Sequence, residues 1–446
     1  MSSFRVRQHE EISLFLKQVC REIKAKEVHK EVRMELQSHL EELIEDKLSN
    51  GVELDAAIKE SIAQMGMPDA IGQQFHLAHR PRFNWGLLAV VVLFMTIGLV
   101  AIFSAQTALV NRLGLTSIGL KQIVYLGIGS CLMLIIGFSN YRKLAKFSWG
   151  LYVGTIALLI YVYLFGNLTN GSRGYVNWYP FQMNIPALSP YLLLIALAGI
   201  WSTSQRFVAN ESFMTAFLRR SWINVGTVWL AGLLMLSIHN IDNFILFFIG
   251  CLTLLQVLRM KHRVLIAHCS LFTVALGWFL LSQSYKLNRI FAFIHPTEDT
   301  RGMNFLLTQS KIAMQSAGWS GHGFGAPLNA LPYLQAEMMF PFLIYCFGWG
   351  AGIAMVIMVT LFVQQMVGVS RKARDPYGKA LVSGLLSLFV IQYVWNMLMW
   401  IGLAPFSSFH LPLISYSGSL VIFQFIALGL ILSVYRRKDL GTRQFT

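Results

Sequence analysis

The sequence predicts an all-α, polytopic membrane protein of about ten transmembrane helices, preceded by a small helical domain. Three observations predict this class. The mean hydropathy is +0.55 and 13% of the residues are charged, about half the charged fraction of a typical soluble domain. The apolar residues fall in blocks of roughly 18–25, the length that a helix needs to cross a hydrocarbon core. The acidic residues gather before residue 83, where 14 of the 21 lie, which leaves the rest of the chain largely apolar.

The first segment, residues 1–82, is expected to form a separate cytoplasmic helical domain. One helix is expected from Glu27 to Leu48, ended by Asn50–Gly51, and a second from Leu54 to Met65, before Met67–Pro68 breaks it. The apolar face of the first helix comprises Val28, Val32, Leu36, Leu40, Leu43 and Leu48. The segment resembles the short prefix domain ahead of some bacterial permeases, which implies regulation or assembly.

Residues 83–446 are expected to form the transmembrane domain. No cleavable signal peptide is expected, because a charged segment of about 80 residues comes before the first apolar block. The fourth apolar block is short and carries prolines. The blocks lie near residues 85–104, 120–138, 147–165, 187–201, 222–238, 243–258, 263–282, 338–366, 379–402 and 412–435.

The positive charges predict the orientation in the membrane. Residues 83–446 hold 24 Lys/Arg and 7 Asp/Glu, so the formal charge of +15 arises from the membrane part and does not indicate nucleic-acid binding. The cations concentrate in alternate connections, which places both termini in the cytoplasm and the long loop 283–337 outside. The basic connections contain Arg142–Lys146, Arg206–Arg220, Arg259–Arg263, Arg371–Lys379 and Arg436–Arg443; the opposite ones contain only Arg112, Lys121 and Arg173.

The loop 283–337 is long for a membrane connection, and long ordered loops commonly carry function. Its middle, 306–318, is amphipathic and is expected to lie on the membrane face as a helix. The glycine-rich run 318–325 indicates close backbone packing. Its cations, Lys286, Arg289, Arg301 and Lys311, would suit an anionic substrate such as a lipid diphosphate; solvation or contact with lipid headgroups is the alternative.

Few carboxylates are available for proton chemistry after residue 83. Three lie in basic cytoplasmic loops and balance charge, and two lie in an exposed turn. Asp242 is either a helix N-cap or a pathway residue. Glu337 precedes the apolar run Met338–Gly350 and is the candidate general base, because charged groups at membrane depth are costly; a helix-capping glutamate is the alternative. The five others are Glu211, Glu298, Asp299, Asp375 and Asp439.

The membrane part resembles the SEDS family, which includes RodA, FtsW and SpoVE. The most specific match is the run 392–420, and the segments 102–106, 121–129, 170–178, 285–296 and 309–318 are similar as well. In this run the chain keeps the following residues of the family pattern: Gln392, Asn396, Gly402, Leu403, Pro405, Leu411, Pro412, Ser415, Tyr416, Gly418 and Ser419.

The resemblance implies a peptidoglycan glycosyltransferase. Such an enzyme polymerises lipid II into glycan strands for the cell wall, in the control of cell shape, in division or in sporulation. Glu337, eleven residues before Gly348, would take the place of the family's catalytic aspartate. Gln335 stands where the family has histidine, and 184–191 lacks the family's Glu and Lys. The substrate-binding candidates are Arg289, Lys311, Arg173, Lys121, Gln309 and Asp242.

The resemblance also implies a bacterial inner-membrane location and a class B penicillin-binding transpeptidase as partner. Ser415, Tyr416 and Gly418 are expected to shape a packed loop near the site. A divalent cation, Mg or Mn, could assist the leaving diphosphate, although the sequence predicts no metal-ligand cluster. Two rival hypotheses stay open, a flippase for lipid-linked precursors and a non-catalytic scaffold for a cell-wall synthase.

Overall fold

The computed structural model divides the chain into two compact units, one of Met1–Phe83 with Tyr435–Thr446 and the other of Asn84–Val434. The structure describes residues 9–24, 28–78, 83–113, 117–169, 172–178, 181–204, 213–283, 287, 293–294, 303–328 and 331–438.

The smaller unit is a helical bundle in which two of the helices were predicted and two were not. α3 and α4 match the expected helices. Pro68 was expected only to break the preceding helix, but it is also the first residue of α5. Proline is tolerated there because the N–H at the first helical position has no helical partner. The four helices are α2 (Glu10–Glu22), α3 (His29–Ser49), α4 (Leu54–Met65) and α5 (Pro68–Ala78).

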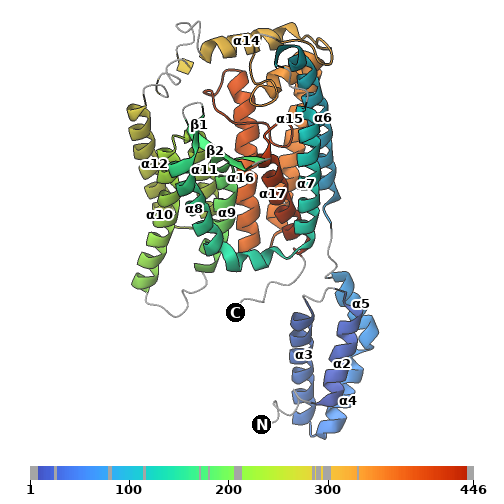
Figure 1. Cartoon of the computed structure of the whole chain (residues 1–446). Helices are drawn as coiled ribbons and strands as arrows, with labels where there is room; N and C mark the ends of the chain where they lie inside the picture. The colour runs from blue at the N-terminus through green and yellow to red at the C-terminus, as the bar shows by residue number, and fades with distance from the viewer. Residues whose placement is uncertain are drawn as a thin grey trace. The chain divides into compact units, whose positions relative to one another are not determined.

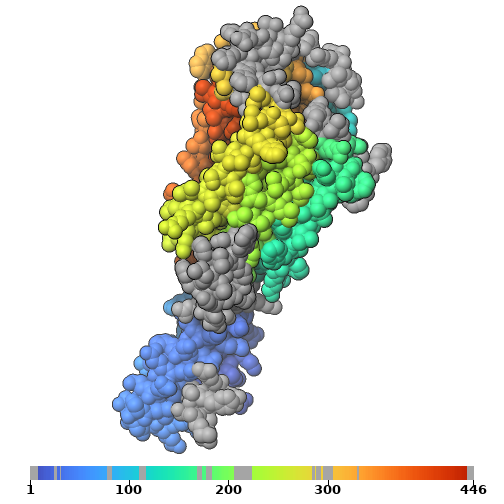
Figure 2. All heavy atoms as spheres, turned by 90° about the vertical axis from the view of Figure 1, so that its left-hand side faces the viewer, coloured from blue at the N-terminus to red at the C-terminus, as the bar shows by residue number. Residues whose placement is uncertain are grey.

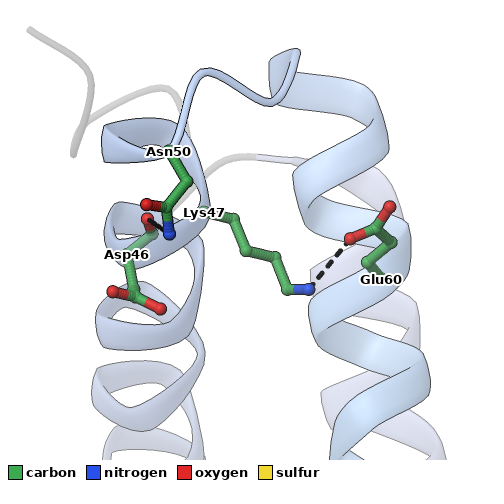
Figure 3. Close-up of polar contacts among 4 residues, drawn as sticks. All are labelled: Asp46, Lys47, Asn50 and Glu60. Carbon is green, nitrogen blue, oxygen red and sulfur yellow. Dashed lines mark hydrogen bonds and ion pairs between the residues drawn. The ribbon is translucent and has the colours of Figure 1, made fainter.

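The core of this unit follows a four-residue step along α3. Val32, Leu36, Leu40 and Ile44 are buried against α2 and α4, so Ile44 takes the core position expected for Leu43. Between α3 and α4, the ammonium of Lys47 lies 2.9 Å from a carboxylate oxygen of Glu60 (Figure 3). The side-chain amide of Asn50 donates to the Asp46 carbonyl at 3.0 Å, which closes the end of α3.

The larger unit is a helical bundle, and each of the ten expected apolar blocks falls on a helix (Figure 1). Eight described helices are long and apolar enough to cross a membrane, and two shorter apolar stretches lie at Ile223–Ser237 and Ile241–Val257. The helices are α6 (Trp85–Leu113), α7 (Ile118–Phe138), α8 (Ser148–Phe165), α9 (Ile185–Ser204), α10 (Phe213–Ser237), α11 (Ile241–Val257), α12 (His262–Ser282), α15 (Met339–Lys372), α16 (Pro376–Trp400) and α17 (Ser419–Arg436).

α9 occupies the centre of the bundle and α12 its outside. α9 packs against α8, α11 and α16, and 89% of its most apolar stretch is buried. Pro186 lies in the first turn, where its missing N–H has no helical partner, whereas Pro190 lies inside the helix and removes one helical hydrogen bond. In α12, 11% of the most apolar stretch is buried. Its atoms, yellow in Figure 2, lie on the outer face of the molecule.

Three features of the bundle differ from the expected spans. The last span begins at Ser419, not near 412, because 412–418 is non-helical. α15 bends at Gly348, whose φ of 80° and ψ of 176° are not helical. A three-stranded antiparallel sheet precedes α9, with strands β1 (Asn167–Thr169), β2 (Ser172–Trp178) and β3 (Phe181–Asn184) in the order β1–β2–β3.

The sheet lies at the same end of the bundle as the segment from α12 to α15, and we call this the loop end. The described part of that segment contains α14 (Met303–Ser316), where an amphipathic helix was expected; it lies across the bundle in Figure 1. The glycine-rich run packs backbone to backbone, as expected: a Cβ on Gly321 would lie 2.6 Å from the Gly348 nitrogen. The remaining short element is the 3-10 helix η2 (Tyr141–Phe147), which leads into α8.

Candidate active site at the loop end

Glu337 lies just ahead of α15 and is half-buried. The N-cap of α15 is Met338, without a side-chain capping bond, so the alternative of a helix-capping glutamate is not supported by the cap geometry. Four residues earlier, Tyr333 has a φ of 53°, a conformation that non-glycine residues rarely adopt and that occurs preferentially at functional sites.

The main chain around Glu337 is held by α16 and by the connection after it. The amide of Asn396 and the indole N–H of Trp400 donate to the Glu337 carbonyl at 3.1 and 2.9 Å. Two residues earlier, the Gln335 carbonyl accepts from the Tyr416 backbone N–H at 2.8 Å. Residues far apart in the chain therefore converge on the segment 331–338.

α16 ends in a turn at Gly402, and Lys311 of α14 lies beside this turn. The N–H of Leu403 donates to Leu398 and that of Gly402 to Met399, at 2.9 and 3.1 Å, which is the pattern of a Schellman turn with Gly402 at φ 81°. A Cβ on Gly402 would lie 2.8 Å from Nζ of Lys311. The ammonium thus lies beside the negative end of the α16 dipole, one turn from the residues that hold Glu337.

The 402–418 loop is built from the motif residues of the sequence. The hydroxyl of Tyr393 donates to the Pro412 carbonyl at 2.7 Å. The Ser415 hydroxyl accepts from the Leu411 N–H at 3.2 Å. Ser419 begins α17 and is buried, while Gly418 has a φ of 55°. These contacts give the motif a scaffolding role around the Glu337 segment.

The hairpin of β2 and β3 supplies a further neighbour of Glu337. Tyr175 faces Asn184 across the two strands. Burial raises the pKa of the Tyr175 phenol, the hydrogen bond with Asn184 lowers it, and the charges of Glu337 and Tyr333 raise it further. The phenol therefore remains a hydrogen-bond donor close to the candidate base.

The other predicted site residues have different surroundings. The guanidinium of Arg173, on β2, donates to the Tyr163 carbonyl at 2.6 Å and is exposed. Lys121 is exposed in the first turn of α7, and Gln309 is half-buried on α14. Arg289 lies outside the described residues.

Asp242 lies in the first turn of α11 and binds the 402–418 loop. Its carboxylate accepts from the hydroxyl and the backbone N–H of Ser408 at 2.6 and 3.1 Å. The N-cap of α11 is Asn240, whose side chain accepts from the Asn243 N–H, so the N-cap interpretation of Asp242 was wrong.

Sequence reasoning did not single out Trp400 and Tyr175. Trp400 lies four residues after Asn396, so the helical period of α16 carried a signal for it. Tyr175 lies two residues after Arg173 on β2, but the register shifts between them: Arg173 pairs with Leu168 and Tyr175 with the adjacent Asn167. Because such a bulge breaks the two-residue alternation, the strand period carried no signal for Tyr175. Within the described part of the chain, no three His, Cys, Asp or Glu residues gather in a way that could hold a metal ion.

Residues 84–440 match the family model FTSW_RODA_SPOVE, described as cell cycle protein. Among curated relatives, stage V sporulation protein E of Bacillus subtilis is 26% identical over 362 residues, which cover 78% of this chain and 96% of that protein. A probable peptidoglycan glycosyltransferase FtsW of Thioalkalivibrio sulfidiphilus is 29% identical over 379 residues, covering 82% and 92%. The peptidoglycan glycosyltransferase RodA of Treponema pallidum is 25% identical over 427 residues, covering 80% and 98%.

Solved structures share the fold. A chain from a study of how a peptidoglycan synthase complex coordinates polymerization and crosslinking superimposes with a TM-score of 0.65 at 19% identity, covering 80% of this chain and 99% of that one. The rod shape determining protein RodA of Thermus thermophilus gives a TM-score of 0.58 at 20% identity, covering 79% and 97%.

Proposed function

The chain belongs to the FTSW_RODA_SPOVE family of cell cycle proteins, and from this membership we propose that it is a peptidoglycan glycosyltransferase that polymerises lipid II. The names of the relatives support the activity. The structural observation that carries the proposal is Glu337, a half-buried carboxylate whose main chain is held by Asn396 and Trp400 at the loop end of a membrane bundle.

In the proposed reaction, the Glu337 carboxylate takes the proton from the 4-hydroxyl of the acceptor sugar. The acceptor oxygen attacks the anomeric carbon of the donor, a new C–O bond forms, and the bond from that carbon to the diphosphate breaks. The lipid diphosphate leaves with two phosphates whose charge needs compensation. We propose Lys311 for this role, supported by the position of its ammonium beside Gly402, with Arg289 and Arg173 as further candidates.

Tyr175 supports the same assignment. Its phenol keeps its proton near Glu337, so it can donate to a sugar oxygen or to the carboxylate. A divalent cation, Mg or Mn, is a further part of the proposal, because it would assist the leaving diphosphate; the described His, Cys, Asp and Glu side chains include no group of three or more that could hold it.

We propose the orientation that the positive-inside rule gives, in a bacterial inner membrane. The loop end faces outward, and the connections that carry Arg142–Lys146 and Arg371–Lys372 face the cytoplasm together with both termini. A class B penicillin-binding transpeptidase is the proposed partner, supported by the similarity to a chain from a peptidoglycan synthase complex.

The test is polymerisation of lipid II by the purified protein co-expressed with a candidate transpeptidase. The native chain is compared with Glu337→Gln and Glu337→Asp. We expect glycan polymer from the native chain, only a small residual rate from the Gln variant, and an intermediate rate from Asp, because shortening the side chain moves the carboxylate by roughly 1 Å. Absence of polymer from the native complex would favour the flippase or scaffold hypothesis. Polymer from Glu337→Gln at the native rate would exclude Glu337 as the base.

A further inference from the structure

The backbone carbonyl of Glu337 accepts two hydrogen bonds from one helix. We propose that Asn396 and Trp400 form a clamp on α16 that positions the Glu337 carboxylate for catalysis. The inference rests on the proposed role of Glu337 as the base. It assigns to Trp400 a function in the reaction that the residue performs without touching the substrate.

The Glu337 carbonyl is available for the clamp because α15 does not use it. The first carbonyl of α15 to accept a helical bond is that of Met338, which accepts from the Phe342 N–H at 3.1 Å. The carbonyl one residue earlier lies outside the helical ladder. A buried carbonyl without a partner is costly, and α16 supplies two donors to this one.

The two donors are fixed by the helix that carries them. Asn396 and Trp400 are four residues apart and lie on the same face of α16. Neither side chain is exposed. The indole of Trp400 contacts the ring of Phe406 edge to face, with centroids 5.8 Å apart, so its N–H has little freedom to leave the Glu337 carbonyl.

Asn396 joins the clamp to the motif loop. Its amide donates both to the Glu337 carbonyl, at 3.1 Å, and to the Phe409 carbonyl, at 2.6 Å. One buried side chain therefore couples the segment 331–338 to the 402–418 loop. A displacement of either segment would break a bond that water cannot replace in the buried interior.

The clamp matters for catalysis because it holds the main chain from which the Glu337 side chain extends. Holding the carbonyl restrains the peptide unit between Glu337 and Met338, and this limits how far the Cα–Cβ bond of Glu337 can move. Glutamate has one more rotatable bond than aspartate, so the carboxylate depends on a well-fixed main chain to reach one position. Misplacement by about 1 Å can lower a rate by about 100-fold.

The first experiment compares Trp400→Phe with Trp395→Phe in the complex used for polymerisation. Trp395 is a matched control, because its indole N–H on the same helix donates to the Pro405 carbonyl at 3.1 Å and not to Glu337. We expect Trp400→Phe to lower kcat between about tenfold and 100-fold with KM unchanged. We expect Trp395→Phe to stay within about twofold of the native rate.

A double-mutant cycle separates positioning from general damage. If Trp400 acts through Glu337, Trp400→Phe has no further effect on the residual rate of Glu337→Gln. A further loss equal to that seen in the native background would overturn the proposal, as would equal losses in Trp400→Phe and Trp395→Phe.

Hydrogen exchange tests the clamp without any activity. We expect the amides of residues 331–340 to exchange between about twofold and tenfold faster in Trp400→Phe than in the native protein, the worth of one hydrogen bond, and to be unchanged in Trp395→Phe. Unchanged exchange in Trp400→Phe would refute the clamp. If the native complex makes no polymer yet exchange responds as expected, the proposed function fails and the clamp stands.

Discussion

The carboxylate of Asp242 holds Ser408 through two hydrogen bonds, one from the hydroxyl at 2.6 Å and one from the backbone N–H at 3.1 Å. The two residues are 166 positions apart in the chain. The contact joins the start of α11 to the 402–418 loop, whose other contacts reach the Glu337 segment. Asp242 therefore has a structural role that is sufficient to explain a carboxylate at this end of the bundle.

We expect Asp242→Ala to destabilise the protein by about 1–3 kcal/mol, because both donors of Ser408 lose a charged acceptor. Asp242→Asn keeps an oxygen acceptor and should retain most of the stability. The thermal unfolding temperature of the detergent-purified protein measures both. If the Asn variant unfolds at native temperature but loses activity, the negative charge itself acts on the substrate.

We expect Gly348→Ala to destabilise the protein by at least about 2 kcal/mol. A Cβ at this position would overlap the Trp319 carbonyl, and the φ of 80° is unfavourable for alanine. Gly350→Ala is the control, because its Cβ would lie 3.9 Å from the same oxygen. Thermal unfolding compares the two variants; equal unfolding temperatures would mean that the glycine-rich run does not need its backbone contact with α15.

We expect the contribution of Tyr175 to the stability of the protein to be lost at alkaline pH. Its pKa in the folded protein is raised, chiefly by burial, so its contribution to stability is complete below the unfolded pKa of about 10 and is lost as the pH rises through the folded value. The difference in unfolding temperature between the native protein and Tyr175→Phe should therefore shrink above about pH 10. Tyr161→Phe, on the exposed face of α8, is the control. A difference that stays constant up to pH 11 would contradict the assignment.

The helical domain should depend on its apolar core more than on its ion pair. Ile44 is fully buried, and Ile44→Ala is expected to cost about 2–5 kcal/mol. Lys47→Met breaks the pair with Glu60, whose side chain is 57% exposed, and is expected to cost at most about 1 kcal/mol. Hydrogen exchange over residues 10–65 of the full chain ranks the two. A larger effect from Lys47→Met would show that the contact in Figure 3 matters more than exposed pairs usually do.

Much of the architecture could be predicted because its signals are local. A run of about 20 apolar residues is sufficient to indicate a membrane helix, and all ten expected blocks fall on helices. The amphipathic stretch of α14 and the helices α3 and α4 follow from periodicity. The small sheet was missed because its strands are short and lie between two strongly apolar blocks. The last span was predicted too long because 412–418 is apolar enough to resemble a helix.

The candidate site was only partly predictable. Glu337 could be selected because few carboxylates follow residue 83 and it stands directly before the apolar block near 338–366. The partners of its main chain could not, since Asn396 and Trp400 lie 59 and 63 residues further along. A hydrogen bond between residues so far apart in the chain produces no periodic pattern in the sequence from which it could be predicted. The same holds for Lys311, which reaches the end of α16 from a separate helix.

Local composition was sufficient to predict the class of the protein, the approximate spans and the candidate base, because hydrophobicity and charge can be read from neighbouring residues. The packed fold was needed to show that Asp242 binds Ser408 rather than capping α11, that the motif residues scaffold a loop, and that Trp400 donates to the Glu337 carbonyl. Hydrogen bonds between distant segments exist only once the helices have packed, so the chain order alone does not contain them.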